Sequence, residues 1–180
     1  MILRRFTAAD ASVLAALHGD AAVMRHIDDG RPVSRDVVEQ ETLPAILREY
    51  AVLPTGFGQF AALAPEFVGW FSLKPATSVG LDPGDVELGY RLRPAVWGRG
   101  LATQGARLLV RRAFTSLGVE RVVATTMTVN VASRRVLEKA GLRHVDTFFA
   151  DWPDPVPGAE HGDVVYAVTR AEWLSAVVPW

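Results

Sequence analysis

Three glycines and an arginine lie close together in AVWGRGLATQG, residues 95–105. Gly98 and Gly100 leave the backbone open to close approach, and Arg99 adds a mobile cation. A helical pattern follows, so the free N–H groups of a helix N-terminus would point out of the same loop. The segment therefore predicts a phosphate or pyrophosphate site. A tight strand-to-helix connection without a ligand is the alternative that the glycines alone leave open.

Two common phosphate loops fit this segment poorly. A Walker loop needs a lysine followed by serine or threonine after its last glycine, and none follows here. A dinucleotide fingerprint needs a third glycine where Thr103 stands, and an acid at the end of the next strand. Glu120 lies at about the right distance but begins its strand. The loop thus predicts a third kind of phosphate site.

Other catalytic chemistries find little support in the sequence. The chain has no cysteine, which removes thiol nucleophiles and disulfides and suits a reducing compartment. Its histidines at 18, 26, 144 and 161 show no metal-ligand spacing, so no metal is expected. No G-x-S-x-G elbow is present. His144 and Asp146, expected on one face of a strand, and Glu160 with His161 are weaker acid–base candidates.

Alternating and helical patterns place the loop between a strand and the clearest amphipathic helix of the chain, 102–117, which Gly118 ends. Pro44 is expected to break or kink the second helix. Asn130 and Thr169 are candidate N-caps. The expected strands are 2–6, 57–63, 66–73, 86–92, 119–127, 143–149 and 164–168, and the expected helices are 7–20, 34–50, 102–117, 130–142 and one from 169.

This order predicts an α/β fold with a single mixed, mostly antiparallel sheet of about seven strands flanked by helices. The strands before residue 75 suit an antiparallel meander, and the alternation over 85–149 suits parallel pairing. We expect one domain spanning residues 1–180, since 180 residues suffice for one core.

Charge and hydropathy argue against two classes of partner, nucleic acids and membranes. The formal net charge is −1, which gives no general attraction to nucleic acid. No apolar run reaches the ~18 residues of a membrane span, and the N-terminus lacks the apolar region of a secretory signal. We therefore expect a cytoplasmic protein that binds neither nucleic acid nor membrane.

Residues 86–114, VELGYRLRPAVWGRGLATQGARLLVRRAF, and the run NVASRRVLEKAGL at 130–142 together resemble the GNAT N-acetyltransferase superfamily. WGRGLA (97–102) is similar to its acetyl-coenzyme A pyrophosphate signature, Q/R-x-x-G-x-G/A. Trp97 stands where Gln or Arg is usual, as in the branch that contains the ribosomal-protein N-terminal acetyltransferases. The similarity, which extends to VVYAVTRAEW, spans residues 1 to about 174, and implies two splayed parallel strands at the centre of the sheet.

The resemblance also implies the site. The pyrophosphate would be cradled by the backbone amides of Arg99, Gly100, Ala102 and Thr103, and the strand 90–92 would bind the pantetheine and the thioester carbonyl. The residues expected to contact acetyl-CoA are Tyr90, Arg91, Leu92, Trp97, Gly98, Arg99, Gly100, Leu101, Ala102, Thr103, Asn130, Ser133 and Arg134.

Two catalytic residues are expected by the same resemblance. Direct attack of an amine on a thioester needs a general base and a proton donor for the thiolate. Glu87, on the strand before the loop, is the candidate base. Leu137 occupies the place of the tyrosine acid of several relatives, so Ser133 is the candidate donor. The alternatives are an exposed strand-end carboxylate and a helix-surface hydroxyl.

The acceptor stays open at this stage. An N-terminus of a protein or peptide is favoured by the branch that Trp97 suggests. A small amine, such as an aminoglycoside or a polyamine, is the alternative, and a non-catalytic acyl-CoA-binding module is a third. Acids that could attract a cationic amine are Asp28, Asp29, Asp151, Asp154, Glu160 and Asp163, with Trp152 among them. By analogy alone, a homodimer is also possible.

Overall fold

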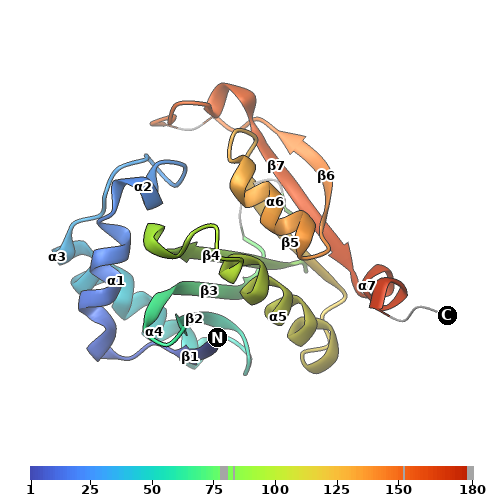
Figure 1. Cartoon of the computed structure of the whole chain (residues 1–180), viewed down its shortest axis with the longest axis horizontal. Coiled ribbons are helices and arrows are strands. Elements are labelled where there is room, and N and C mark those ends of the chain that lie inside the picture. The colour runs from blue at the N-terminus through green and yellow to red at the C-terminus, as the bar shows by residue number, and fades with distance from the viewer. Residues whose placement is uncertain (78–80, 83, 152, 178–180) are drawn as a thin grey trace. The chain divides into compact units, whose positions relative to one another are not determined.

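The computed structural model describes residues 1–77, 81–82, 84–151 and 153–177. Its strands form one seven-stranded mixed sheet in the order β1-β2-β3-β4-β5-β7-β6. Helices flank the sheet (Figure 1). The chain divides into two compact units, unit 1 with residues 1–74 and 89–102, and unit 2 with residues 75–88 and 103–180. Each unit is described by itself below.

Unit 1 begins with an antiparallel three-stranded meander covered by short helices. Its elements are β1 (Ile2–Arg5), the 3-10 turn η1 (Ala8–Asp10), α1 (Ala11–His18), α2 (Ala21–Met24), α3 (Arg35–Val37), the π-helical turn η2 (Val38–Thr42), α4 (Leu43–Val52), β2 (Gly58–Leu63), β3 (Phe67–Pro75), the end of β4 (Val86–Leu92) and the 3-10 turn η3 (Pro94–Val96). The expected β2–β3 hairpin is confirmed, whereas α2 carries no clear pattern and was not expected.

Of the break or kink expected at Pro44, the structure shows no break, although the helix is divided by a π-turn into α3 and α4. Residues 35–52 remain helical, and the hydrogen bonding widens before the proline, where the Leu43 N–H bonds to the Val38 carbonyl. A proline ring clashes with the carbonyl four residues earlier in an α-helix. A π-turn relieves such a clash without ending the helix. The Ser34 hydroxyl caps the start, because it accepts from the Val37 N–H at 3.3 Å.

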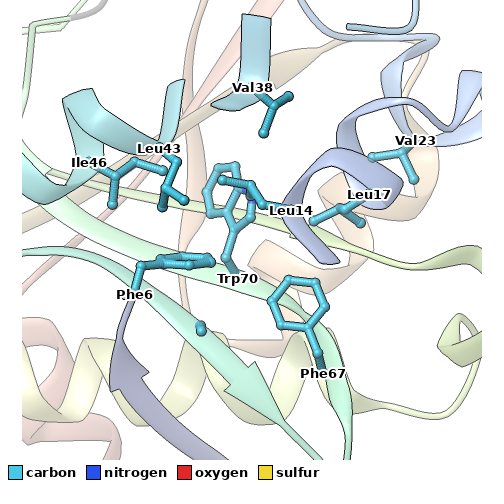
Figure 2. Packing of buried hydrophobic residues seen from close by; sticks show 10 residues of the cluster. Phe6, Leu14, Leu17, Val23, Val38, Leu43, Ile46, Phe67 and Trp70 are labelled. Atoms are coloured by element: carbon cyan, nitrogen blue, oxygen red, sulfur yellow. The ribbon is translucent and has the colours of Figure 1, made fainter. Parts of the chain in front are cut away.

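The core of unit 1 joins the helices to the sheet. Figure 2 shows the Trp70 ring in the middle of this cluster, which combines residues from both layers. Its members are Phe6, Leu14, Leu17, Val23, Val38, Leu43, Ile46, Ala61, Phe67 and Trp70. The helical residues among them recur at intervals of three to five, so a single face of each helix is buried.

Unit 2 contains the start of β4, α5 (Leu101–Ser116, from Thr103 on), β5 (Arg121–Met127), α6 (Val131–Lys139), β6 (Arg143–Phe148), the 3-10 turn η4 (Ala159–His161), β7 (Asp163–Thr169) and α7 (Arg170–Val177). Figure 1 shows α6 beside β5 and β6. Gly118, with φ +66°, follows α5 as expected, and Gly141, with φ +97°, follows α6 in the same way. Glu172 closes the predicted capping box, since it accepts from the Thr169 N–H at 2.8 Å.

β4 and β5 form the expected parallel pair. Their ladder is described at Val86–Val122 and Glu87–Val123, within unit 2. The expected separation of β4 from β5 beyond these pairs involves residues of both units, so it stays a prediction. The expectation of one domain over residues 1–180 also stays a prediction. β5 then pairs with β7 along its whole length, in antiparallel fashion.

The β6 strand departs from the sequence expectation at one point. A register shift between His144 and Asp146 leaves them opposite the adjacent residues Tyr166 and Val165. Adjacent residues of a strand point to opposite faces, so the bulge removes the shared face expected for His144 and Asp146. That expectation is wrong.

Candidate active site

The glycine loop in unit 1 is anchored on its N-terminal side and exposed beyond that anchor. The Arg93 N–H donates to the Val68 carbonyl at 2.9 Å, and the Trp97 indole N–H donates to the Leu92 carbonyl at 2.8 Å. Trp97 thus ties the loop back to the end of β4, while Gly98, Arg99 and Gly100 are exposed. This anchoring keeps the backbone of the loop in a fixed position without covering it.

Left-handed backbone explains the two glycines of the loop. Gly98 has φ +73° and Gly100 has φ +76°, and no heavy atom lies within 4 Å of a Cβ built on either residue. Glycine is therefore required by conformation and not by crowding. The space above both residues is open to a ligand.

α5 starts directly after this loop, at Leu101, and runs for 16 residues. The first four N–H groups of an α-helix have no partner within the helix, and its dipole places partial positive charge there. No acidic side chain lies in this first turn. Leu101, Ala102 and Thr103 therefore carry the N–H groups that the predicted anion site needs, and the binding of a pyrophosphate there stays a prediction.

The end of β4 approaches β3 closely at Arg91. A Cβ on Gly69 would lie 2.1 Å from the Arg91 carbonyl oxygen, so only glycine fits there. On the same strand, the ring of Tyr90 contacts that of Phe71 at 5.8 Å between centroids, and Leu92 is buried. The strand expected to bind pantetheine is thus rigidly packed in unit 1.

The Arg91 side chain enters a cluster that the sequence did not reveal. Its guanidinium lies 5.4 Å from the centroid of the Trp70 ring, 3.6 Å from the Asp28 carboxylate and 3.5 Å from the Met24 Sδ atom. The Trp70 indole N–H donates to His18 Nε2 at 3.1 Å. These residues come from separate segments, so no local pattern could have grouped them.

Burial controls the protonation of this cluster. Burial lowers the pKa of Arg91, although the nearby Asp28 carboxylate opposes this. Burial, with the charge of Arg91, lowers the pKa of His18 to about 4. At neutral pH His18 is therefore uncharged and accepts from Trp70, while Arg91 keeps its charge.

In unit 2, Glu87 lies half-buried on β4. Its Oε1 atom accepts from the Thr125 hydroxyl at 3.2 Å, across the parallel β4–β5 pair. The carboxylate is therefore fixed on the strand that leads to the glycine loop. Its role as general base stays a prediction.

α6 brings three of the predicted residues together. Asn130 Oδ1 accepts from the Ser133 N–H at 3.2 Å, which confirms Asn130 as the N-cap. Arg134 donates to the Thr128 carbonyl at 3.1 Å and to the Tyr166 hydroxyl at 3.2 Å. The guanidinium of Arg134 thus ties α6 to β5 and β7, and its predicted contact with the coenzyme stays a prediction.

The tyrosine network continues beyond Arg134. Tyr166 is fully buried, and its hydroxyl donates to Glu138 at 2.9 Å. Leu137, at the place of the tyrosine acid in several relatives, is also buried. Ser133, which is half-buried in the first turn of α6, remains the candidate proton donor.

The weaker acid–base candidates have ordinary surface contacts. His144 Nε2 lies 2.9 Å from the Thr147 hydroxyl, and His161 lies 3.6 Å from Glu160. Trp152, expected near the acceptor, lies outside the described residues. Over those that are described, no group of three or more His, Cys, Asp or Glu side chains could hold a metal. None of the helices found there is long and apolar enough to cross a membrane.

Comparison with known proteins identifies the family. The family model described as "Acetyltransferase (GNAT) domain" matches residues 1–143. The FsC-acetyl coenzyme A-N(2)-transacetylase of Aspergillus fumigatus is 41% identical over 165 residues, which cover 89% of this chain and 69% of that protein.

Solved structures show the same fold. The aminoglycoside acetyltransferase AAC(6')-Ib in complex with ribostamycin and coenzyme A superposes with a TM-score of 0.77 at 21% identity, over 99% of this chain and 98% of that one. The spermidine N-acetyltransferase of Vibrio cholerae, in complex with CoA and spermine, gives 0.74 at 15% identity, over 97% and 98%. The chain belongs to the GNAT family and is an acetyl-CoA-dependent N-acetyltransferase.

Proposed function

We propose that this acetyltransferase modifies the primary amine of a small molecule. The observation that carries the proposal is the 41% identity to FsC-acetyl coenzyme A-N(2)-transacetylase over 89% of the chain. The name of that relative gives its acceptor nitrogen as N(2). Acetylation of a protein or peptide N-terminus, favoured by Trp97, stays the competing prediction.

We assign each part of acetyl-CoA to a different group of residues. Acetyl-CoA supplies the activated acyl group, and the exposed loop Gly98–Gly100 with the start of α5 would bind its pyrophosphate through backbone N–H groups. The backbone of Tyr90 to Leu92 would hold the pantetheine. Asn130, which caps α6, would line the same arm.

The chemistry requires two proton movements. The neutral amine attacks the thioester carbon, the carbon–sulfur bond breaks, and the thiolate leaves with the bonding electron pair. Glu87 would accept the proton that the amine loses, directly or through water, and Ser133 would donate one to the sulfur. No covalent enzyme intermediate is needed.

The test is an acceptor screen with acetyl-CoA that measures free thiol. It compares small amines, including α-amino compounds and polyamines, with peptides of varied N-termini. We expect turnover with a small α-amine, and peptides as the sole substrates would overturn the proposal. Coenzyme A that binds while no amine reacts would favour a non-catalytic binding module.

The Glu87→Gln variant tests the proposed general base with the acceptor that the screen identifies. Loss of a general base should lower kcat by about 100-fold or more, while coenzyme A affinity stays unchanged. Glu120→Gln, an exposed carboxylate just before β5, should leave both values alone. The cytoplasmic location and the homodimer also stay predictions, and gel filtration would test the second.

A further inference from the structure

Arg91 is a half-buried cation with little compensation from the protein. Its side chain is 17% exposed, and the carboxylate 3.6 Å away belongs to Asp28, whose side chain is 72% exposed. Within the described part of the chain, no other carboxylate makes an ion pair with Arg91. A guanidinium has five donors, and a thioether sulfur is a weak acceptor. A buried charge with so weak a partner is costly unless another anion joins it.

The surroundings hold this cation in place. The Trp70 ring, against which the guanidinium lies, is fixed from behind by its hydrogen bond to His18, which is 4% exposed. The same ring belongs to the packed cluster in Figure 2. Gly89 lies two residues before Arg91 on the same face of β4, and a Cβ there would lie 2.7 Å from Ser72 Oγ, so the serine side chain would have to move. The charge of Arg91 is thus positioned by four segments of unit 1.

The position of Arg91 on the strand points to the acceptor. Its backbone is part of the segment that the resemblance expects to hold the thioester. If the thioester binds there, the Arg91 side chain leaves the strand close to the carbon that the amine would attack. That side chain reaches toward α2 and the turn after it, at Met24 and Asp28. An acceptor there would bring the atoms beside its amine within reach of the guanidinium.

We infer that Arg91 binds a carboxylate borne by the acceptor next to its reactive amine, and that this anion replaces Asp28 as the partner of the guanidinium. The inference rests on the proposed function, because it names the class of small amine that the site selects. Arg91 is in this view a residue that determines specificity. A planar guanidinium matches a carboxylate with two parallel hydrogen bonds, which a lysine cannot form.

A binding experiment tests the anion site without turnover. N-acetylglycine and N-acetylglycinamide, as product mimics, are titrated by calorimetry into the protein saturated with coenzyme A. We expect N-acetylglycine to bind about 10- to 100-fold more tightly than the amide, the usual worth of a charge-assisted hydrogen bond. Arg91→Gln should abolish this preference, and Arg91→Lys should keep part of it. Equal affinity for the two mimics would overturn the inference.

Asp28→Asn separates recognition from structure. If Asp28 competes with the acceptor anion, removing its charge should raise the affinity for N-acetylglycine by about two- to fivefold, the range of an exposed ion pair. A merely structural Arg91–Asp28 pair predicts no gain from this variant. Arg4→Gln is the matched control for Arg91→Gln, since Arg4 also pairs with a carboxylate, that of Asp10, through two hydrogen bonds of 2.6 and 2.7 Å. It should lower stability without changing the preference.

Turnover distinguishes failure of the inference from failure of the proposed function. L-leucine and L-leucinamide have nearly the same size, and Arg91→Gln should lower kcat/KM for the acid far more than for the amide. Equal losses for both would overturn the inference and leave the function intact. If neither probe nor any other small amine reacts, the proposed function fails, while the calorimetry still decides the anion site. A matching loss of coenzyme A affinity in Arg91→Gln would assign the anion to the coenzyme and overturn the inference.

Discussion

The glycine loop and the Arg91 cluster lie in the same unit but are built in opposite ways. The loop uses consecutive residues, 97–102, and offers backbone N–H groups from an exposed turn. The cluster uses side chains from α1, α2, β3 and β4, and its charge is largely buried. A common donor needs only backbone, whereas selection of one acceptor needs side chains placed by the whole unit. In this unit, exposed backbone would serve the chemistry that the family shares, and packed side chains would serve the choice of acceptor.

Gly100→Trp should break the loop and leave the cluster intact. Its left-handed φ strains any other residue, and a large side chain would cover the N–H groups. Loss of two charge-assisted hydrogen bonds, each worth about 1.5–3 kcal/mol, predicts a fall in coenzyme A affinity of roughly 150-fold or more, measured by calorimetry. Gly118→Trp is the control, since it has φ +66° and equally open space at the far end of α5. Similar affinities for both variants would mean that the loop is only a connection.

His18→Gln should change the cluster and spare the loop. The pKa of His18 falls from 6.5 unfolded to about 4 folded, so this residue contributes stability above pH 6.5 that is lost as the pH drops toward 4. Its share is roughly 3 kcal/mol, at about 1.4 kcal/mol for each pH unit. Urea unfolding at about pH 7 and pH 4.5 should show a smaller loss in the variant, because glutamine still accepts from Trp70 without titrating. An identical pH dependence in both proteins would contradict the burial argument.

Ser133→Ala should act on turnover alone. A proton donor in an acetyl transfer is worth about 100-fold in kcat, while coenzyme A affinity should hardly change. Steady-state kinetics with the acceptor from the screen measures the first, and calorimetry measures the second. Full activity would remove Ser133 from the mechanism.

Asn130→Ala should give the smallest effect and separates capping from coenzyme binding. Loss of an N-cap costs about 1 kcal/mol, and the same cost is expected for Ser34→Ala at the start of α3. Thermal unfolding should therefore show similar shifts for the two variants. Only Asn130→Ala should also weaken coenzyme A binding, and unchanged binding would leave Asn130 with a purely structural role.

Much of the fold could be predicted because its signals are local. The strands, the helix 102–117, the cap at Asn130 and the glycines at 118 and 141 each follow from neighbouring residues. The π-turn before Pro44 and the bulge in β6 could not be predicted, since each depends on how a strained segment fits its partners. The partners of Arg134 likewise come from two distant places: Thr128 directly follows β5, and Tyr166 lies on β7.

The linear pattern was enough to predict the family and most of the strands and helices. It also suggested the glycine loop as a pyrophosphate site, and that role stays a prediction. These features depend on hydrogen bonds and backbone angles within a few residues, which a linear pattern records. The tertiary structure decided where the Arg91 side chain points and which residues hold it, since His18, Asp28, Trp70 and Arg91 meet only after the meander and its helices have packed. Burial then lowers the pKa of both His18 and Arg91, and the carboxylate that pairs with Arg91 is the exposed Asp28. No pattern along the chain records this burial.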